Sequence, residues 1–334
     1  MKPALLSIIC CPLCKGHLEL RNAFEQDGEV ESGLLQCIPC AESYPVVRFI
    51  PRFVPVDNYA TNFGLQWNRF RQTQLDSHSR LPISRERFFR QTGWSPNDLA
   101  GKNVLDVGCG AGRFAEIVLS CKANLFAIDY SSAVDACWHN LGPHQSLNVV
   151  KGDIYHLPFK PGSFDFVYCF GVLQHTPDVK RAFMALPVQL CEGGRLAVDL
   201  YPTQSKNLFW PKYWLRGLTK RMAPSGLFKL VQWMVKLLFP VSFVLGRFPV
   251  IGHKLRYIIP IANYDGVYPL SNDQLREWAI LDTFDMLAPT YDQPQSAQTL
   301  SDWFVNTGLK RIDIFRAGVL VGRGVKIAIN KCIE

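Results

Sequence analysis

The sequence has no fixed period among its 24 Gly and 22 Pro, which excludes collagen-like and repeat architectures. It has no run of about 18 uncharged apolar residues, the length that a membrane-spanning helix needs, so it predicts no span. The apolar stretch near its start, Leu5–Ile9, is too short for a secretory leader. These absences predict a cytoplasmic protein, and 334 residues of which 48% are apolar provide ample material for a folded core.

Acidic residues are absent from one long block. Residues 201–264 contain ten Lys and Arg but no Asp or Glu, so the whole excess of positive charge behind the net charge of +8 is concentrated there and indicates an anionic partner. A helix expected over 225–239, capped by its first serine and ended by Pro240, is apolar except for a narrow stripe that includes Lys229 and Lys236. Such a helix must bury its surface in protein, ligand or lipid. We therefore expect the block to form a packed lid or to make peripheral contact with an anionic membrane.

Cysteine is concentrated near the N-terminal end. Cys11 and Cys14 form one CxxC pair, and Cys37 and Cys40 form a second. Two such pairs offer four thiolates to a tetrahedral Zn²⁺, each pair on one tight turn. Because a closed site of four cysteines leaves no open coordination position, we expect a structural zinc in a small hairpin ribbon.

The flanking residues extend this pattern. The segments 5–16 and 44–51, the second of which contains Tyr44-Pro45-Val46, resemble the small zinc-ribbon family that includes the activator subunit of certain methyltransferases. The resemblance implies a compact ribbon over residues 1–55. The cysteines beyond it are scattered in apolar contexts, which is typical of reduced core thiols in a cytoplasm.

Strand and helix patterns alternate from Gly101 onward. A helix is expected over 178–191, before the last of the expected strands. The strands are expected at 103–107, 125–129, 147–150, 163–169 and 193–199. This alternation predicts an α/β fold with a doubly wound, mostly parallel sheet that binds its ligand at the carboxyl ends of the strands.

A glycine-rich loop follows the first of these strands. Gly108, Gly110 and Gly112 allow a tight turn close to a ligand at the positive end of a helix. Asp129, which ends the second strand, is placed to accept hydrogen bonds from both hydroxyls of a ribose. The spacing is GxGxG rather than GxGxxG, and Asp106 before the loop would repel a pyrophosphate but attract a cationic amino-acid group. The loop therefore disfavours a nicotinamide dinucleotide.

The run 104–114 resembles the first motif of class I S-adenosylmethionine-dependent methyltransferases, and the resemblance covers residues 101–200 and, less distinctly, 300–334. It implies S-adenosylmethionine as cofactor and a seven-stranded sheet that ends in an antiparallel pair, for which 309–314 and 325–329 are suitable. By the family's pattern Asp153 binds the adenine amino group. The cofactor-binding set that the resemblance implies is Asp106, Gly108, Gly110, Gly112, Asp129, Tyr130, Asp153, Ile154 and Phe170.

Methyl transfer depends mainly on alignment, and it needs a general base only when the acceptor is a hydroxyl or another protonated group. His175, after the fourth strand, is the first candidate base, although it is equally suited to cap the next helix. Tyr201 follows the fifth strand. Asp285 lies in a segment, 281–291, that resembles methyltransferases of bacterial glycan and natural-product clusters. No SPPY-like or NPPY-like run follows the fourth strand, which disfavours the amino groups of bases as acceptors.

The sequence thus predicts a zinc ribbon (1–55), a helical linker or lid (56–100), a methyltransferase core (101–200 and 301–334) and an inserted helical cap (201–300). The predicted acceptor is a small molecule, such as a sugar or a lipid-linked intermediate with an anionic group. An RNA or translation-factor methyltransferase is the alternative, but the ribbon carries more acids than bases, which makes nucleic acid an unlikely partner. A non-catalytic scaffold is a further alternative, and the oligomeric state stays open.

Overall fold

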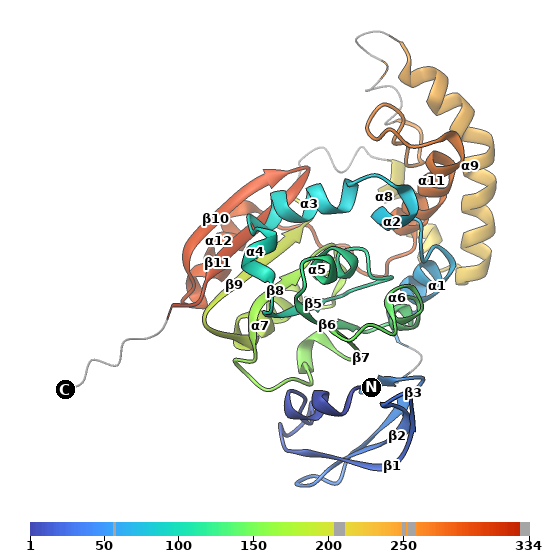
Figure 1. Cartoon of the computed structure of the whole chain (residues 1–334). Coiled ribbons are helices and arrows are strands. Elements are labelled where there is room, and N and C mark those ends of the chain that lie inside the picture. Colours follow the sequence, from blue (N-terminus) through green and yellow to red (C-terminus); the bar gives the residue numbers. More distant parts are fainter. Residues whose placement is uncertain (56–57, 204–210, 249–251, 253–257, 328–334) are drawn as a thin grey trace.

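The computed structural model describes residues 1–55, 58–203, 211–248, 252 and 258–327. A small sheet lies at the bottom of Figure 1, a larger sheet with its helices lies at the centre, and a group of cap helices lies at the upper right. Two expectations fall partly outside the described residues. These are the end of the last strand, at 328–329, and the parts of the basic block at 204–210, 249–251 and 253–257.

The small sheet is an antiparallel ribbon in the order β1-β2-β3-β4, preceded by a 3₁₀ helix at Pro3–Ser7. Its strands are β1 (Leu18–Gln26), β2 (Glu29–Cys37), β3 (Ser43–Val47) and β4 (Ile50–Pro51). Asp27 and Gly28 join β1 to β2, and both have positive φ, as a two-residue hairpin turn requires. The ribbon expected from the cysteine pairs is therefore confirmed.

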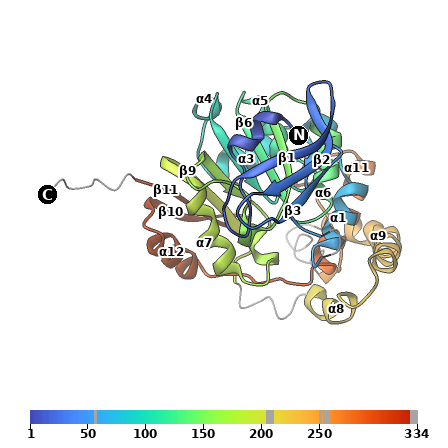
Figure 2. The same ribbon diagram turned by 90° about the horizontal axis from the view of Figure 1, so that it is seen from below.

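The ribbon is docked firmly onto the larger sheet. The Cys10 amide donates to the Pro158 carbonyl at 3.0 Å, and the Phe53 amide donates to the Lys151 carbonyl at 2.8 Å. One continuous cluster of buried side chains includes Ile9 of the ribbon and Phe159 of the larger unit. In Figure 2, which views the molecule from below, the ribbon lies in front of the larger sheet. Because the two parts share one hydrophobic cluster, neither can lose its packing without exposing apolar surface of the other.

The larger sheet has seven strands in the order β10-β11-β9-β8-β5-β6-β7. The strands from β5 to β9 pair in parallel, and β10 and β11 pair antiparallel at one edge. Their bounds are β5 Asn103–Val107, β6 Asn124–Asp129, β7 Leu147–Lys151, β8 Phe164–Cys169, β9 Leu190–Leu200, β10 Lys310–Ala317 and β11 Val319–Val325. The predicted doubly wound sheet is confirmed, and so is a final antiparallel pair. The position of its second strand was predicted wrongly: the expected strand at 325–329 meets β11 only at Val325, because Gly318 turns the chain directly after β10 and β11 begins at Val319. The strand order reverses between β5 and β8, and ligands bind at such a point in folds of this kind.

Helices of the core pack directly on this sheet, α6 on β6 and β7, α7 on β8 and β9, and α12 on β10 and β11. Their bounds, with those of neighbouring short helices, are α5 Ala115–Ser120, α6 Ala133–Leu141, α7 Val179–Gln189, α12 Ala297–Asn306, α3 Ile83–Thr92 and α4 Pro96–Leu99. Two 3₁₀ helices, Ile154–His156 and Leu173–His175, follow β7 and β8.

A lid and a cap complete the fold. They consist of α1 (Thr61–Arg69), α2 (Asp76–Ser79), α8 (Pro211–Thr219), α9 (Pro224–Gly246) and α11 (Asn272–Leu287). Both α8 and α9 pack on α11, and α1 contacts α6 and α11. The lid therefore bridges the core and the cap.

The helix α9 differs from its prediction at both ends. Its N-cap residue is Ala223 rather than Ser225, because Pro224 fits the first turn, where its missing N–H costs nothing. The helix also continues through Pro240, since Phe239 and Ser242 on either side are buried and hold the two turns together. Among the helices of the described residues, α9 alone is long and apolar enough to cross a membrane by length and composition, a property that core helices of soluble proteins share.

Candidate active site and metal centre

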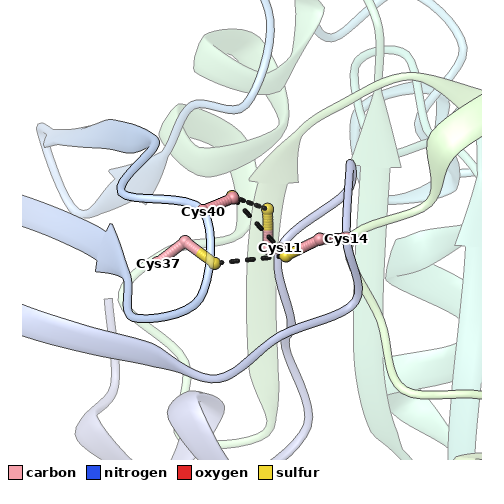
Figure 3. Close-up of side chains that lie close together, drawn as sticks. All are labelled: Cys11, Cys14, Cys37 and Cys40. Atoms are coloured by element: carbon pink, nitrogen blue, oxygen red, sulfur yellow. Dashed lines mark hydrogen bonds between the residues drawn. The ribbon is translucent and has the colours of Figure 1, made fainter.

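The four paired cysteines converge at one end of the ribbon (Figure 3). All four Sγ atoms lie within 4.8 Å of one another. The sulfur of Cys14 is 3.4 Å from that of Cys37 and 3.5 Å from that of Cys40, and the Cys11 and Cys40 sulfurs are 3.7 Å apart. Tetrahedral Zn–S bonds of about 2.3 Å place neighbouring sulfurs about 3.8 Å apart. The donor set and its spacing therefore fit a zinc ion.

Groups around the cluster support thiolates. The Tyr44 hydroxyl lies 3.3 Å from the Cys11 sulfur, and the Gly16 amide donates to the Cys14 sulfur at 3.4 Å. Hydrogen bonds of this kind orient metal ligands and stabilise their charge. Cys10 is adjacent in sequence but does not belong to the cluster. With four sulfur ligands the site is closed, which suits a structural role.

A cavity of about 560 Å³ lies at the carboxyl ends of the central strands. Its lining includes residues that end or follow β5, β6, β8 and β9, together with side chains of α1 and α11. It lies at the strand-order reversal between β5 and β8, and its volume suits a ligand the size of a nucleoside with a second small molecule beside it.

One half of the cavity is formed by the glycine loop. Gly108, with φ of +85°, could not be replaced, because a Cβ there would lie 2.2 Å from a methyl of Val172. The Asp129 carboxylate holds the loop from below: it accepts from the Gly110 amide at 3.0 Å, and from the Ser131 amide and hydroxyl at 2.8 and 2.7 Å. A carboxylate has about four acceptor positions, so capacity for a ribose hydroxyl remains. Trp67 of α1 closes over Gly110.

The predicted cofactor residues separate into two groups. Those that line the cavity are Gly108, Gly110, Asp129, Tyr130, Ile154 and Phe170. Asp106, Gly112 and Asp153 are not part of the lining. Asp106 is buried beneath the loop, and burial raises its pKa to about 8. Gly112 packs against Leu141, and the Asp153 side chain accepts from the Tyr155 amide, so both have structural contacts in the structure.

The other half of the cavity contains His175, which is 6% exposed. Its Nδ1 lies 3.0 Å from the Tyr291 carbonyl oxygen. A carbonyl can only accept, so Nδ1 carries the proton, and in the neutral ring Nε2 is left as an acceptor. The next helix, α7, is capped instead by Asp178, whose side chain accepts from the Arg181 amide. The helix-capping alternative for His175 therefore does not describe this structure.

Tyr201 and Asp285 lie beside this histidine. The rings of His175 and Tyr201 meet edge to face with centroids 5.5 Å apart. The Tyr201 hydroxyl is 3.5 Å from one Asp285 oxygen, and the Gln66 amide donates to the other at 3.3 Å. Burial raises the pKa of Tyr201 well above its ordinary value, which keeps the hydroxyl protonated as a donor. The three predicted catalytic residues thus come together in one half of the cavity.

Further polar residues of this half come from the lid, the cap and the end of the glycine loop, and were not part of the predicted site. They are Gln74, Arg87, Arg113, Tyr264, Tyr268, Trp278 and Asp282. Tyr264 and Gln74 both donate to the Asp282 carboxylate, and burial raises the pKa of that carboxyl to about 6. No local pattern could have identified them, because they meet only when α3, α11 and the glycine loop are brought together.

Comparison with known proteins gives two family matches. The methyltransferase-domain family matches residues 105–198. The Trm112p-like protein family matches residues 2–48, the part that holds the four cysteines.

The curated relatives match the core region. A demethylmenaquinone methyltransferase of Thermobifida fusca is 34% identical over 122 residues, which are 35% of this chain and 52% of that protein. A ubiquinone biosynthesis O-methyltransferase of Cronobacter sakazakii is 31% identical over 136 residues, 38% of this chain and 54% of that protein. An uncharacterised Synechococcus protein is 32% identical over 33% of this chain and 28% of its own length. The chain thus spans about half the length of these relatives or less.

Solved structures resemble the chain more loosely. A complex of the Haloferax volcanii Trm112 methyltransferase activator with a methyltransferase has a TM-score of 0.46 at 13% identity, over 80% of this chain and 98% of that chain. A methyltransferase of Aquifex aeolicus has a TM-score of 0.42 at 12% identity, over 81% of this chain and 100% of that one. With its seven-stranded sheet, its glycine loop and its cluster of cysteines, the chain carries an S-adenosylmethionine-dependent methyltransferase domain and, at its N-terminal side, a Trm112p-like zinc-ribbon domain.

Proposed function

We propose that the protein transfers the methyl group of S-adenosylmethionine to a hydroxyl of a small molecule held beneath the cap. The observation that carries this proposal is the orientation of His175. Its Nδ1–H donates to the Tyr291 carbonyl, so Nε2 is the nitrogen that can accept a proton within the cavity. The relative named as a ubiquinone biosynthesis O-methyltransferase supports oxygen as the methylated atom.

The residues of the cavity have separate tasks in this reaction. The cofactor supplies an electrophilic methyl group on a sulfonium, and S-adenosylhomocysteine is the leaving group. Asp129 binds the ribose and braces the loop. His175 takes the proton of the acceptor hydroxyl as the O–CH₃ bond forms and the S–CH₃ bond breaks. Tyr201 and Asp285 position the acceptor, and the lid excludes water, so alignment supplies much of the acceleration.

The second half of the cavity suits an acceptor with several hydroxyls and an apolar face. The Asp285 and Asp282 carboxylates and the Gln74 amide offer hydrogen bonds, while Trp278 and Tyr268 offer ring surfaces. A sugar or a lipid-linked intermediate has this combination of groups. We infer that the acceptor belongs to this class and that the zinc of the ribbon has a structural role only.

Replacing Asp129 by alanine is expected to weaken the binding of S-adenosylhomocysteine about tenfold to a hundredfold, because a charged acceptor of a ribose hydroxyl is lost. Isothermal titration calorimetry measures this. Ser131→Ala is the matched control, since it removes one of the hydrogen bonds that hold the Asp129 carboxylate but leaves the carboxylate in place. Equal affinity for wild type and Asp129→Ala would mean that the cofactor does not bind at β6.

We also infer a peripheral membrane contact through the cap. The outer face of α9 exposes Trp233 (61%), Leu237 (49%), Val241 (47%) and Val244 (58%), which lie along one side of the helix. Lys229 and Lys236 are exposed on the helix, Arg247 is exposed at its C-terminal end, and Lys220 and Arg221 are exposed just before it begins. In Figure 1 this helix forms the outer edge of the cap. Apolar side chains flanked by cations suit the surface of an anionic membrane, where each Lys or Arg contributes about 1 kcal/mol.

Reversing two of these charges tests the contact. Lys229→Glu with Lys236→Glu should weaken co-sedimentation with phosphatidylserine vesicles at least about tenfold at low salt, without changing the affinity for S-adenosylhomocysteine. Lys122→Glu with Lys180→Glu, which reverses two exposed charges on the core, is the control and should bind vesicles more tightly than the α9 variant. If the wild-type protein does not sediment with vesicles at low salt, the membrane contact is contradicted, and α9 serves only as an outer helix of the cap.

A further inference from the structure

Two arginines lie close together in the half of the cavity that the cap covers. Arg87 comes from α3, and Arg113 follows the glycine loop. Their guanidinium carbons are 5.4 and 5.2 Å from the centroid of one ring, that of Phe114. Each keeps part of its surface accessible, and each lines the cavity. The fold thus brings two cations to one ring, although their positions in the sequence give no sign of it.

Hydrogen bonds fix both side chains. Arg87 donates from Nη2 to Asp199 at 2.7 Å and from Nε to Gln91 at 3.3 Å. Arg113 donates from Nε to Ser84 at 2.9 Å and from Nη1 to Gln74 at 2.8 Å. One nitrogen of each group, Nη1 of Arg87 and Nη2 of Arg113, has no hydrogen-bond partner among the described residues, and neither is sealed off from the cavity. The two free nitrogens are therefore held in place before any ligand arrives.

The charge of this pair is only half compensated. Asp199 is the one carboxylate of the described residues within ion-pair distance of either guanidinium, and it pairs with Arg87. Burial lowers the pKa of Arg113 to about 10, and the charge of Arg87 lowers it too. Asp282 makes no direct ion pair with Arg113, but it is connected to it through the Gln74 amide, and its charge raises the pKa of Arg113 in part. A buried cation without a direct ion pair is costly, so the site is stabilised when an anion enters.

We propose that Arg87 and Arg113 bind a carboxylate or phosphate group inside the cavity through these two nitrogens. A guanidinium group keeps its charge and directs its N–H donors in one plane, so it suits a carboxylate or phosphate better than an ammonium does. The inference rests on the proposed function, because the anion is carried by a molecule of the methyl transfer reaction. It is either the amino-acid carboxylate of the cofactor or an anionic group of the acceptor.

Removing the charge of Arg113 tests the proposal. Arg87 is left unchanged, since its loss would leave Asp199 buried without its cationic partner. The variant is Arg113→Gln, and the matched control is Arg85→Gln, which removes an exposed arginine of the same helix as Arg87 that lies over Phe89. Isothermal titration calorimetry measures the affinity of each variant for three ligands. Two are nucleosides: S-adenosylhomocysteine and methylthioadenosine, which lacks the amino-acid carboxylate. The third is inorganic phosphate, added to protein that is already loaded with S-adenosylhomocysteine.

Two results support the proposal and identify the source of the anion. If Arg113→Gln weakens the binding of S-adenosylhomocysteine at least tenfold but leaves the affinity for methylthioadenosine unchanged, the arginine pair binds the cofactor carboxylate. If both nucleosides bind as before and phosphate binding is lost, the pair binds the acceptor. Arg113→Lys keeps the positive charge and serves as a control in case Arg113→Gln does not fold. It should lose part of the affinity for the same ligand, because an ammonium lacks the forked N–H donors of a guanidinium.

One result overturns the proposal: unchanged affinities of Arg113→Gln for S-adenosylhomocysteine and for phosphate, with a thermal unfolding curve like that of Arg85→Gln. A different result would show that the proposed function fails. The wild-type protein would then bind no S-adenosylhomocysteine, while the affinity of the unloaded protein for phosphate would still depend on Arg113.

Discussion

Replacing Cys37 by serine is expected to release zinc and to destabilise the whole chain. Structural zinc contributes about 10–16 kcal/mol of apparent binding free energy in zinc-finger peptides, and a hydroxyl is a poor substitute for one of the four thiolates. The ribbon shares its hydrophobic cluster with the core, so its unfolding would expose apolar surface around Phe159. A loss of about 5 kcal/mol corresponds, for a chain of 334 residues, to a fall of about 7 °C in the melting temperature.

Elemental analysis and differential scanning calorimetry measure both effects. Wild-type protein should contain one zinc per chain, and Cys37→Ser should contain much less. Cys10→Ser is the matched control, because Cys10 is buried next to the cluster but does not belong to it. Full zinc content in Cys37→Ser, or a wild-type protein purified without chelators that contains no zinc, would contradict this account of the ribbon.

His175→Ala is expected to lower the rate of methyl transfer by about 10²–10⁴-fold, the usual contribution of a general base. The affinity for S-adenosylhomocysteine should not change, because the predicted role of His175 lies on the acceptor side. The assay follows labelled methyl from S-adenosylmethionine into the small-molecule fraction of an extract from a strain that lacks the gene.

His139→Ala, on the exposed side of α6, is the control and should keep the wild-type rate. If His175→Ala keeps that rate too, no base is needed at this position, and alignment alone would have to account for catalysis. That outcome would also favour an acceptor that is not protonated near neutral pH.

The sequence predicts the core of the fold well, because its signals are local. Each strand from β5 to β8 is a short, largely apolar run, and the spacing of the glycines between β5 and α5 is a local motif. The four cysteines were equally informative, since metal coordination restricts which residues can meet. The error at α9 arose where packing outweighs local preference: Pro240 would end an isolated helix, but buried neighbours keep it continuous.

The candidate site divides in the same way. Gly108, Gly110 and Asp129 could be predicted because one strand–loop–helix unit and the next strand position them. Arg87, Arg113 and Asp282 could not, because they come from the lid, the loop and the cap and meet only in the folded chain. His175 could be identified as a candidate, but its hydrogen-bonding role required the Tyr291 carbonyl, which lies far along the sequence.

A crystal structure of the intact protein with S-adenosylhomocysteine tests the central claim most directly. The account predicts one molecule per chain in the cavity of about 560 Å³, with its ribose hydroxyls at the Asp129 carboxylate and its sulfur directed toward His175 and Tyr201. A nucleoside bound elsewhere, or a cavity that stays empty at saturating ligand, would contradict it.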